Sequence, residues 1–382
     1  MAIETRVSAS DGKKRYLVRV EARTDDGRRK QQRVGTFGSK RDAERAEAEA
    51  VAQRERGTLL SPDSTTVAEL LDEWLKTKAG EISTNSLVDY GVSIRKHLKP
   101  AFGTTKIQKL SAARISSQYV QWRDEGRSAH VIRGAHLRLS QSLDFAVRTK
   151  LLLHNPARDV KPPRINRPKF DYWVPEEAAR FLAFAREDAL CPLWDLLLRE
   201  GMRRGEALGL RWRDVNLDRG MAHIVQSVIP DKANRGAARV QSRTKTAAGT
   251  RPVKLSAETV NALRERRKRW LATKLASEVW QDTDLILCTR DGAPVNPDNI
   301  DRSFRAIVRA AELRRIKVHE LRHTSATLLL LAGISPKVVS EKLGHASIAI
   351  TLDTYSHVLP NMQAEAALAM SRLLDIPINA MG

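Results

Sequence analysis

The chain has 382 residues, with 66 lysines and arginines against 45 aspartates and glutamates, a net charge of +21 and a pI near 10.3. A chain this basic is attracted to polyanions at ordinary salt and is long enough for two or three domains, so nucleic acid is the first partner to consider. Its two cysteines match no metal-binding spacing, its start has no apolar signal-peptide core, and no apolar run reaches the roughly 18 residues of a membrane span, so we expect a soluble, cytoplasmic protein.

The first 60 residues predict a small sheet followed by one helix. Apolar and polar side chains alternate from Arg15 to Ala22, a turn signal follows at Asp25-Asp26-Gly27, and a second basic strand covers Lys30 to Val34. Ser39 begins a segment rich in alanine, glutamate and arginine, which indicates a helix to about Arg56.

This N-terminal region is also strongly basic. Between residues 13 and 33 the sequence has nine basic and three acidic side chains. Because a β-ribbon fits the major groove, we interpret the strands as a DNA-binding surface rather than as merely solvated strands. The candidate DNA contacts are Lys13, Lys14, Arg15, Arg19, Arg28, Arg29 and Lys30.

Residues 65–160 predict an all-α domain, joined to the first by a turn-rich connector at 57–65. Apolar side chains recur at helical spacing at Val67, Leu70, Leu71, Trp74 and Leu75. Further helices fit Asn85 to Lys99, Ser111 to Glu125 and Ala129 to Lys150. We assign Trp74, Tyr119 and Trp122 to the core rather than to base stacking. The proline-rich, basic segment 161–171 then indicates a linker.

From residue 172 the pattern predicts a mixed, mainly helical domain. Arg203 falls in the bend between a helix that ends at Gly201 and one that starts at Glu206. Strands are expected at Ala222 to Ile229, Arg239 to Thr246 and Arg251 to Leu255, with Lys245 at the mouth of a hairpin formed by the last two. Residues 232–254 contain seven basic and no acidic side chains, and Arg243 among them is a further candidate DNA contact.

Two features complete this domain. The basic segment Ala257 to Glu278 predicts a helix, and we assign most of its charges to solvent or to the DNA backbone. Residues 319–355 alternate short helices with polar turns: the leucine run 328–331 is expected to be largely buried, Gly333 and Gly344 suit helix ends, and Ser335-Pro336 suits a helix start. This alternation places His319, Arg322, His345 and Tyr355 near helix termini, where their side chains can converge on one anionic partner.

Together these residues resemble the active-site set of the tyrosine recombinases, in particular the phage integrases. The resemblance rests on Arg203 in GMRRGE, Lys245 before Thr246, His319-x-x-Arg322, Leu343-Gly344-His345 and Tyr355 in TYSHV. It covers roughly residues 65 to 375, while the first 60 residues more weakly resemble the arm-type DNA-binding domain of integrases. Tyr355 lies ten residues after His345, one more than in many relatives.

The resemblance implies a fold, a reaction and a set of partners. It implies an arm-type DNA-binding domain at 1–60, a helical core-binding domain at 65–160 and a catalytic domain at 172–382 whose C-terminal segment docks on a neighbouring subunit. The implied partners are double-stranded DNA at attachment core and arm sites, a homotetramer on that DNA, a DNA-bending host factor and a directionality factor, within the nucleoid of a bacterial host. No cofactor or metal is expected.

The chemistry explains these residue types. Arg203 and Arg322 can clamp the non-bridging phosphate oxygens, and Tyr355 can form a covalent 3′-phosphotyrosine that conserves the bond energy for rejoining. His319 is the expected base or orienter of the phenol, Lys245 the acid for the departing 5′ hydroxyl, and His345 a donor to the phosphate. Glu206 is expected to hold the arginine cluster. Lys232 and Lys254 compete with Lys245, and Arg204 is a less suitable substitute for Arg203.

Two alternative functions remain open at this point. His319-Glu320-Leu321-Arg322-His323 also fits the H-E-x-x-H zinc motif, with Glu341 as a conceivable third ligand. That reading places Arg322 beside a Zn²⁺ ion and leaves the basic clusters unexplained. The other alternative is a non-catalytic DNA-binding protein such as a repressor, which would form no covalent adduct.

Overall fold

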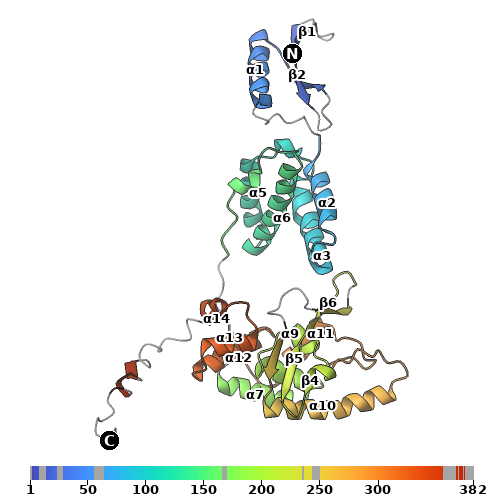
Figure 1. Cartoon of the computed structure of the whole chain (residues 1–382), viewed down its shortest axis with the longest axis vertical. Coiled ribbons are helices and arrows are strands. Elements are labelled where there is room, and N and C mark those ends of the chain that lie inside the picture. The colour runs from blue at the N-terminus through green and yellow to red at the C-terminus, as the bar shows by residue number, and fades with distance from the viewer. Residues whose placement is uncertain are drawn as a thin grey trace. The chain divides into compact units, whose positions relative to one another are not determined.

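The computed structural model describes residues 2–7, 14–23, 29–55, 64–165, 170–234, 236–242, 250–355, 367–368, 370–372 and 374. The chain folds as two compact units, Met1–Asn166 and Arg167–Gly382, and is multidomain and mainly helical with small sheets, as predicted (Figure 1). The finer division into three domains stays a prediction. Within the described residues, no helix combines the length and apolarity that a membrane crossing requires.

The first unit begins with an antiparallel sheet and one helix. The sheet has the order β1-β2-β3, and the elements are β1 (Ala2–Val7), β2 (Lys14–Arg23), β3 (Arg29–Phe37) and α1 (Lys40–Glu55). Strand β1 was not predicted, because its six residues show little apolar alternation and its place depends on pairing with β2, as at Ile3↔Val18. The α1 start agrees with prediction, since Ser39 Oγ accepts a hydrogen bond from the Asp42 backbone N–H at 3.1 Å.

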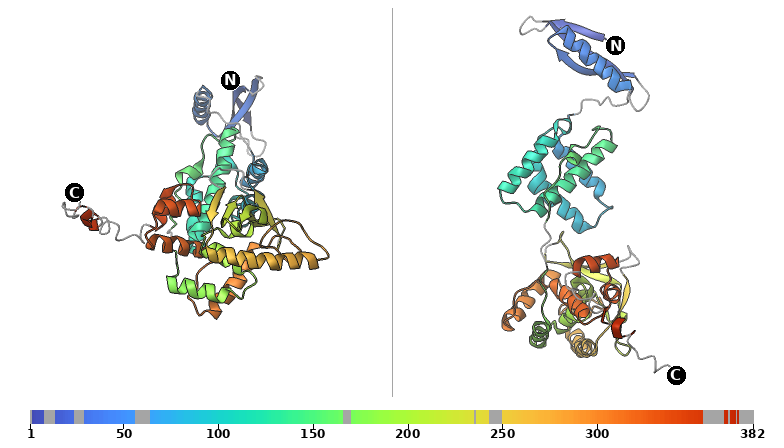
Figure 2. Two further views of the ribbon diagram at one scale, coloured as in Figure 1. Left: turned by 60° about the horizontal axis from the view of Figure 1, so that its bottom comes forward. Right: turned by 90° about the vertical axis from the view of Figure 1, so that its left-hand side faces the viewer.

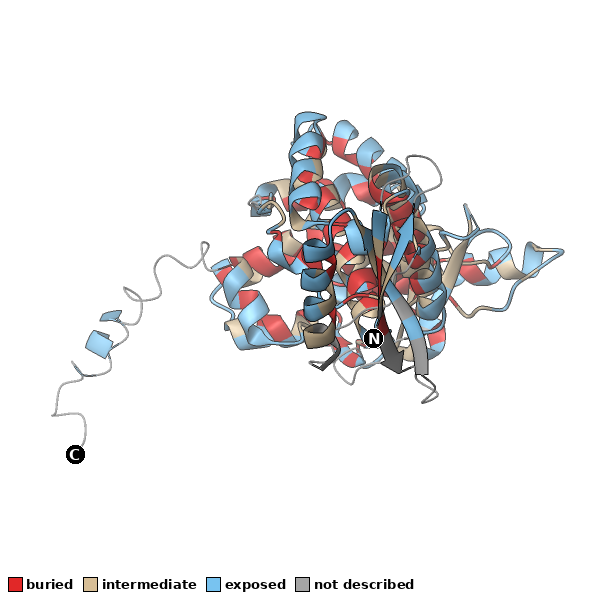
Figure 3. Ribbon diagram, turned by 90° about the horizontal axis from the view of Figure 1, so that it is seen from above, coloured by how far each residue is buried: buried red, intermediate tan, exposed pale blue. Residues whose placement is uncertain are grey.

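The rest of this unit is the predicted helical bundle. Its elements are α2 (Val67–Lys78), α3 (Thr84–Ser93), the π-helix η1 (Ile94–Leu98), α4 (Lys99–Phe102), η2 (Ile107–Lys109), α5 (Ala112–Asp124), α6 (Ala129–Arg148) and η3 (Pro156–Asp159). Trp74, Tyr119 and Trp122 are buried in its core, which confirms the prediction. Buried residues, red in Figure 3, recur along the helices beside exposed ones in pale blue. Thr66 caps α2 by accepting from the Glu69 N–H, while Glu69 accepts from the Thr66 N–H.

The second unit packs helices around two small antiparallel sheets, of order β4-β5-β8 and β6-β7. Its strands are β4 (Val215–Asn216), β5 (Met221–Ile224), β6 (Gln226–Pro230), β7 (Ala238–Ser242) and β8 (Arg251–Lys254). Its helices are α7 (Pro175–Ala185), α8 (Cys191–Leu198), α9 (Arg204–Leu208), η4 (Trp212–Asp214), α10 (Ala257–Ala276), α11 (Pro297–Ala310), α12 (Glu320–Leu331), α13 (Pro336–Leu343) and α14 (Ile348–Tyr355). Trp173, Phe181, Trp194 and Phe304 pack together in the main core.

The strand pairing differs from the predicted hairpin. Strand β7 pairs with β6, as at Val228↔Val240, and β8 pairs with β5, as at Ala222↔Val253. Ala222 and Val253 are both buried in the main core, so burial of a shared apolar face favours this long-range pairing over the neighbouring strand. The described strands β7 and β8 therefore do not pair with each other as predicted, and both Lys245 and Arg243 fall outside the described residues.

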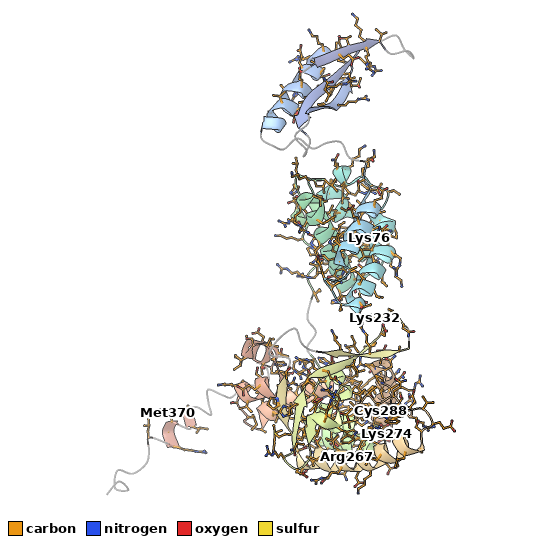
Figure 4. The ribbon with its side chains drawn as sticks, turned by 45° about the vertical axis from the view of Figure 1, so that its right-hand side comes forward. Lys76, Lys232, Arg267, Lys274, Cys288 and Met370 are labelled. Atoms are coloured by element: carbon orange, nitrogen blue, oxygen red, sulfur yellow. The ribbon has the colours of Figure 1, made fainter. Side chains whose placement is uncertain are left out.

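The expectation for the side chains of α10 agrees with the structure, and that for the leucine run was wrong in part. On α10, most basic side chains are exposed, among them Arg267, which Figure 4 labels, while Arg266 is half-buried and its Nε donates to the Ile286 carbonyl at 3.0 Å. In the leucine run, Leu330 is 4% exposed but Leu331 is 57% exposed, because consecutive helical residues point in different directions.

Candidate active site

Arg203 is held at the start of α9 by its own helix. Its backbone N–H donates to Glu206 Oε2 at 3.2 Å and its Nη1 donates to Glu206 Oε1 at 2.8 Å. Nη2 donates to the carbonyl of Gly344 at 3.2 Å, a residue distant in sequence. The helix starts at Arg204, two residues earlier than predicted, and Arg203 is its N-cap. The neighbouring Arg204 instead pairs with Asp298 and Asp301 of α11, which supports the choice of Arg203.

Glu206 links two arginines, one of which sequence reasoning missed. Its side chain is fully buried, and Oε2 accepts a hydrogen bond from Arg251 Nη2 at 2.9 Å. Burial alone would raise the pKa of Glu206, but the charges and hydrogen bonds of Arg251 and Arg203 lower that pKa to about 2. The expectation that Glu206 holds the arginine cluster agrees with these contacts. Arg251, the first residue of β8, had been noted only as part of a basic stretch.

Arg322 is anchored from inside the protein by two backbone carbonyls. It is 4% exposed on α12, with Nη1 donating to the Gly201 carbonyl and Nη2 to the Leu343 carbonyl, both at 2.7 Å. Burial and then the charge of Arg203 lower the pKa of Arg322 to about 9, so the guanidinium stays cationic at neutral pH. An anion bound beside it would relieve this desolvation and repulsion.

The turn after α13 places His345 beside the arginines. Gly344 ends that helix in the left-handed region, with φ of +67°, and an added Cβ would lie 2.6 Å from Arg251 Nη1. Arg251 Nε also donates to the Lys342 carbonyl at 3.1 Å, so the guanidinium lies directly against this turn. His345 Nδ1 forms a 2.7 Å hydrogen bond with Thr351 Oγ1, and burial with the charges of Arg322 and Arg203 lowers the pKa of His345 to about 4.

Tyr355 ends α14 and is buried, 1% exposed, against residues of α12 and α13. The helices α12, α13 and α14 lie close together (Figure 1 and Figure 2). Its hydroxyl forms a 2.8 Å hydrogen bond with Nδ1 of His323, and Phe170 packs edge-on against its ring at 5.2 Å. Burial raises the pKa of Tyr355 to about 12, and the charge of Arg322 acts in the opposite direction. The sequence indicates His323 only as part of the zinc motif, and its contact with the tyrosine comes from the packing of α14 beside α12.

His319 lies at the N-terminus of α12 and lines a cavity of about 650 Å³ with Arg204, Arg315 and Lys317. Its ring meets that of His323 edge-on at 5.2 Å. Burial, followed by the charges of Arg322 and Arg203, lowers the pKa of His319. The predicted residues Arg203, Arg322, His319, His345 and Tyr355 thus come together in one site, whose two guanidinium groups can bind the charge of a phosphodiester.

Sequence and structure comparisons agree with this arrangement. The model of the phage integrase family matches residues 175–362, and that of the phage integrase N-terminal SAM-like domain matches residues 66–122. The chain belongs to the phage integrase family of tyrosine recombinases. Among curated relatives, a tyrosine recombinase XerC-like protein of Caldanaerobacter subterraneus is 25% identical over 95% of this chain and 97% of that protein. The ICEBs1 integrase of Bacillus subtilis is 27% identical over 74% of this chain and 76% of that protein.

Solved integrase structures share the fold. The Tn1549 transposon integrase, in a complex with a circular intermediate DNA, aligns with a TM-score of 0.67 at 19% identity, over 81% of this chain and 100% of that one. A lambda integrase tetramer bound to a Holliday junction aligns with a TM-score of 0.56 at 18% identity, over 89% of this chain and 91% of that one.

The zinc motif reading is not favoured by the contacts that this integrase makes. Glu320, the base of that motif, accepts a hydrogen bond from the backbone N–H of Lys317, and His323 Nδ1 is bonded to Tyr355. Within the described part of the chain, no group of three histidine, cysteine, aspartate or glutamate side chains is arranged to hold a metal ion. Glu341 therefore does not complete a ligand set with the two histidines.

The remaining predicted residues are placed only in part. Lys13 and Arg28 lie outside the described residues, Lys14, Arg15 and Arg19 lie on β2, and Arg29 and Lys30 lie at the start of β3. Lys14 and Arg15 are exposed. Of the two alternatives to Lys245 in this integrase, Lys254 donates from Nζ to the Arg219 carbonyl at 2.6 Å, which leaves it less suited to act as an acid.

Proposed function

We propose that this integrase family member is a site-specific recombinase that cleaves and rejoins DNA through a 3′-phosphotyrosyl intermediate, and so integrates or excises a phage or other mobile element. The observation that carries the proposal is the Tyr355 hydroxyl, hydrogen-bonded to a histidine in a site that also holds Arg203 and Arg322. A phenol beside fixed guanidinium groups can attack a phosphodiester whose developing charge those groups stabilise.

The arginines act as the phosphate clamp. Each uses part of its guanidinium to bind the protein, Arg203 to Glu206 and Arg322 to the Gly201 and Leu343 carbonyls, so both are oriented before DNA arrives. Such preorganised donors cost no rearrangement when charge builds up on the non-bridging oxygens. Glu206 offsets the repulsion between the guanidinium groups, because its carboxylate forms ion pairs with both Arg203 and Arg251.

The remaining roles concern protons and orientation. The departing 5′ oxygen needs a proton. On the basis of the family resemblance, we assign Lys245 as the acid that donates it. His345, uncharged at neutral pH because burial lowers its pKa to about 4, donates to the scissile phosphate through the ring nitrogen that Thr351 does not occupy. His319 stays a candidate base or orienter of the phenol.

The proposed substrate is double-stranded DNA at a core site and at arm sites. The net charge of +21 favours binding to DNA, and the solved lambda integrase tetramer on a Holliday junction supports a homotetramer for this chain also. The C-terminal segment would dock on a neighbouring subunit, and the basic strands of residues 1–60 would bind the arm sites. A DNA-bending host factor and a directionality factor are proposed partners in the bacterial cytoplasm.

Tyr355→Phe provides the direct test. The variant should form no covalent protein–DNA adduct on nicked suicide duplexes drawn from the DNA flanking the gene, while its affinity for the same duplexes stays within about twofold of wild type. Only the nucleophilic oxygen is lost, because the substituted ring can still pack on Phe170. Wild-type adduct formation should persist in EDTA, whereas a zinc enzyme would lose activity. Adduct formation by the phenylalanine variant at the wild-type level would overturn the mechanism.

A further inference from the structure

We propose that His323 is the group that takes the proton of Tyr355 when the phenol attacks phosphorus. This inference rests on the proposed recombinase function and identifies a further catalytic residue for it. The decisive contact joins Nδ1 of His323 and the tyrosine hydroxyl at 2.8 Å, a length at which a proton can pass directly between them. His323 lies on α12, one helical turn after His319 and next to Arg322, so base and clamp are carried by adjacent residues of one helix.

The imidazole of His323 is held in one orientation from both sides. Phe170 stacks on it, with ring centroids 4.4 Å apart and an interplanar angle of 20°, and His319 meets it edge-on. Phe170 also packs against Tyr355, so a single aromatic side chain positions both partners of the hydrogen bond. A ring fixed in this way keeps Nδ1 directed at the hydroxyl, which is the preorganisation that a general base requires.

Burial is the main reason why both groups have the required protonation states. Burial, then the charges of His319, Arg322 and His345, lower the pKa of His323 to about 4, so its ring is neutral and Nδ1 can accept. Burial raises the pKa of Tyr355 to about 12, so the phenol keeps its proton at neutral pH and needs a base. An incoming phosphate adds negative charge beside Arg322, which favours the imidazolium that the reaction creates.

The step balances without any added reagent. The Tyr355 oxygen forms a bond to phosphorus as its proton moves to His323 Nδ1, the bond from phosphorus to the 5′ oxygen breaks, and that oxygen takes a proton from the general acid. Rejoining reverses each transfer: the 5′ hydroxyl attacks phosphorus, and the departing phenolate recovers its proton from His323. In this scheme His319 orients the base or the phosphate. Its ring contacts that of His323, and it lines the basic cavity.

His323→Asn is the most informative variant, because an asparagine oxygen can replace Nδ1 as a hydrogen-bond acceptor but cannot take up the proton at neutral pH. Single-turnover cleavage of a suicide duplex at pH 7 should fall by about 10²–10⁴-fold, the usual contribution of a general base. The loss should shrink as pH rises, by about tenfold per unit, because hydroxide-dependent ionisation of the phenol replaces the base. The cleavage rate of the wild-type protein should show no such dependence on pH above pH 5, where His323 is already neutral.

A chemical rescue separates this role from a structural one. Incorporation of a fluorotyrosine at position 355 lowers the phenol pKa and should restore much of the cleavage rate in the His323→Asn protein. His319→Asn, the matched control, should show neither the pH slope nor the rescue. If His323→Asn cleaves at the wild-type rate or faster, the contact is instead a resting lock on the tyrosine and the inference is overturned. The inference is equally overturned if His323→Asn loses cleavage activity but the loss neither shrinks as pH rises nor is restored by the fluorotyrosine. If wild type itself forms no adduct, the proposed function fails rather than this assignment.

Discussion

At the scale of single residues, the site depends on guanidinium groups that the protein itself holds in place. Arg203→Ala and Arg322→Ala should each lower single-turnover cleavage by about 10²–10³-fold, the usual cost of removing one donor to a developing oxyanion. Arg204→Ala is the matched control, since that arginine is adjacent in sequence but pairs with Asp298 and Asp301. We expect less than tenfold loss in the control. A drop below threefold in either Arg203→Ala or Arg322→Ala would count against the phosphate clamp.

At the scale of elements, the turn after α13 joins helix geometry to the arginine cluster. Gly344 and Gly333 both follow helices with positive φ, of +67° and +77°, so alanine at either position carries a similar backbone strain of about 1–2 kcal/mol. Only at Gly344 would the new Cβ meet Arg251, at 2.6 Å, whereas a Cβ at Gly333 would meet no described residue within 4 Å apart from its own chain neighbours and helix. Alanine variants at the two glycines therefore share the backbone strain, and only the variant at Gly344 adds a clash with Arg251.

Gly344→Ala should consequently affect catalysis as well as stability. Displacement of Arg251 disturbs Glu206, and a shifted turn moves the carbonyl that binds Arg203 and the His345 ring that follows it. We expect both alanine variants to lose comparable unfolding free energy in urea titrations, but only Gly344→Ala to lose at least tenfold in single-turnover cleavage. Equal cleavage by the two variants would show that the Arg251 contact is not needed to shape the site.

At the scale of the whole molecule, the N-terminal sheet and the catalytic unit are predicted to bind different DNA sites. Two sites on one chain raise each other's effective concentration, so the protein can bridge distant DNA segments in one complex. A protein lacking residues 1–60 should therefore cleave core suicide duplexes normally and fail in complete recombination.

A charge reversal tests the same idea in the full chain. Lys14→Glu on β2 should weaken footprints on arm DNA, and Arg45→Glu on α1, also an exposed basic position, should change them much less. Footprints on core DNA should be equal in both variants. The absence of any sequence-specific protection by residues 1–60 outside the core site would contradict arm binding.

Much of this protein is determined locally by its sequence. The caps at Ser39 and Ser335, the glycine at the end of α13 and the apolar stripe that buries Trp74 act within a few residues of chain, so local sequence patterns predict them. The same local turns place Arg203, Arg322, His345 and Tyr355 at or near helix ends. With His319, these residues are singled out in the sequence by the resemblance to tyrosine recombinases, and their catalytic roles stay predictions.

Only the tertiary structure decided which distant residues meet. The pairing of β8 with β5 brings Arg251 to Glu206, and the packing of α14 on α12 brings Tyr355 to His323 and Phe170. The orientation of Leu331 toward solvent likewise depends on which helix faces are covered. The first of these contacts joins residues 45 positions apart, and the contact between Tyr355 and His323 joins residues 32 positions apart. No local propensity encodes them, because long-range contacts are selected by the burial of apolar surface that the separate segments share.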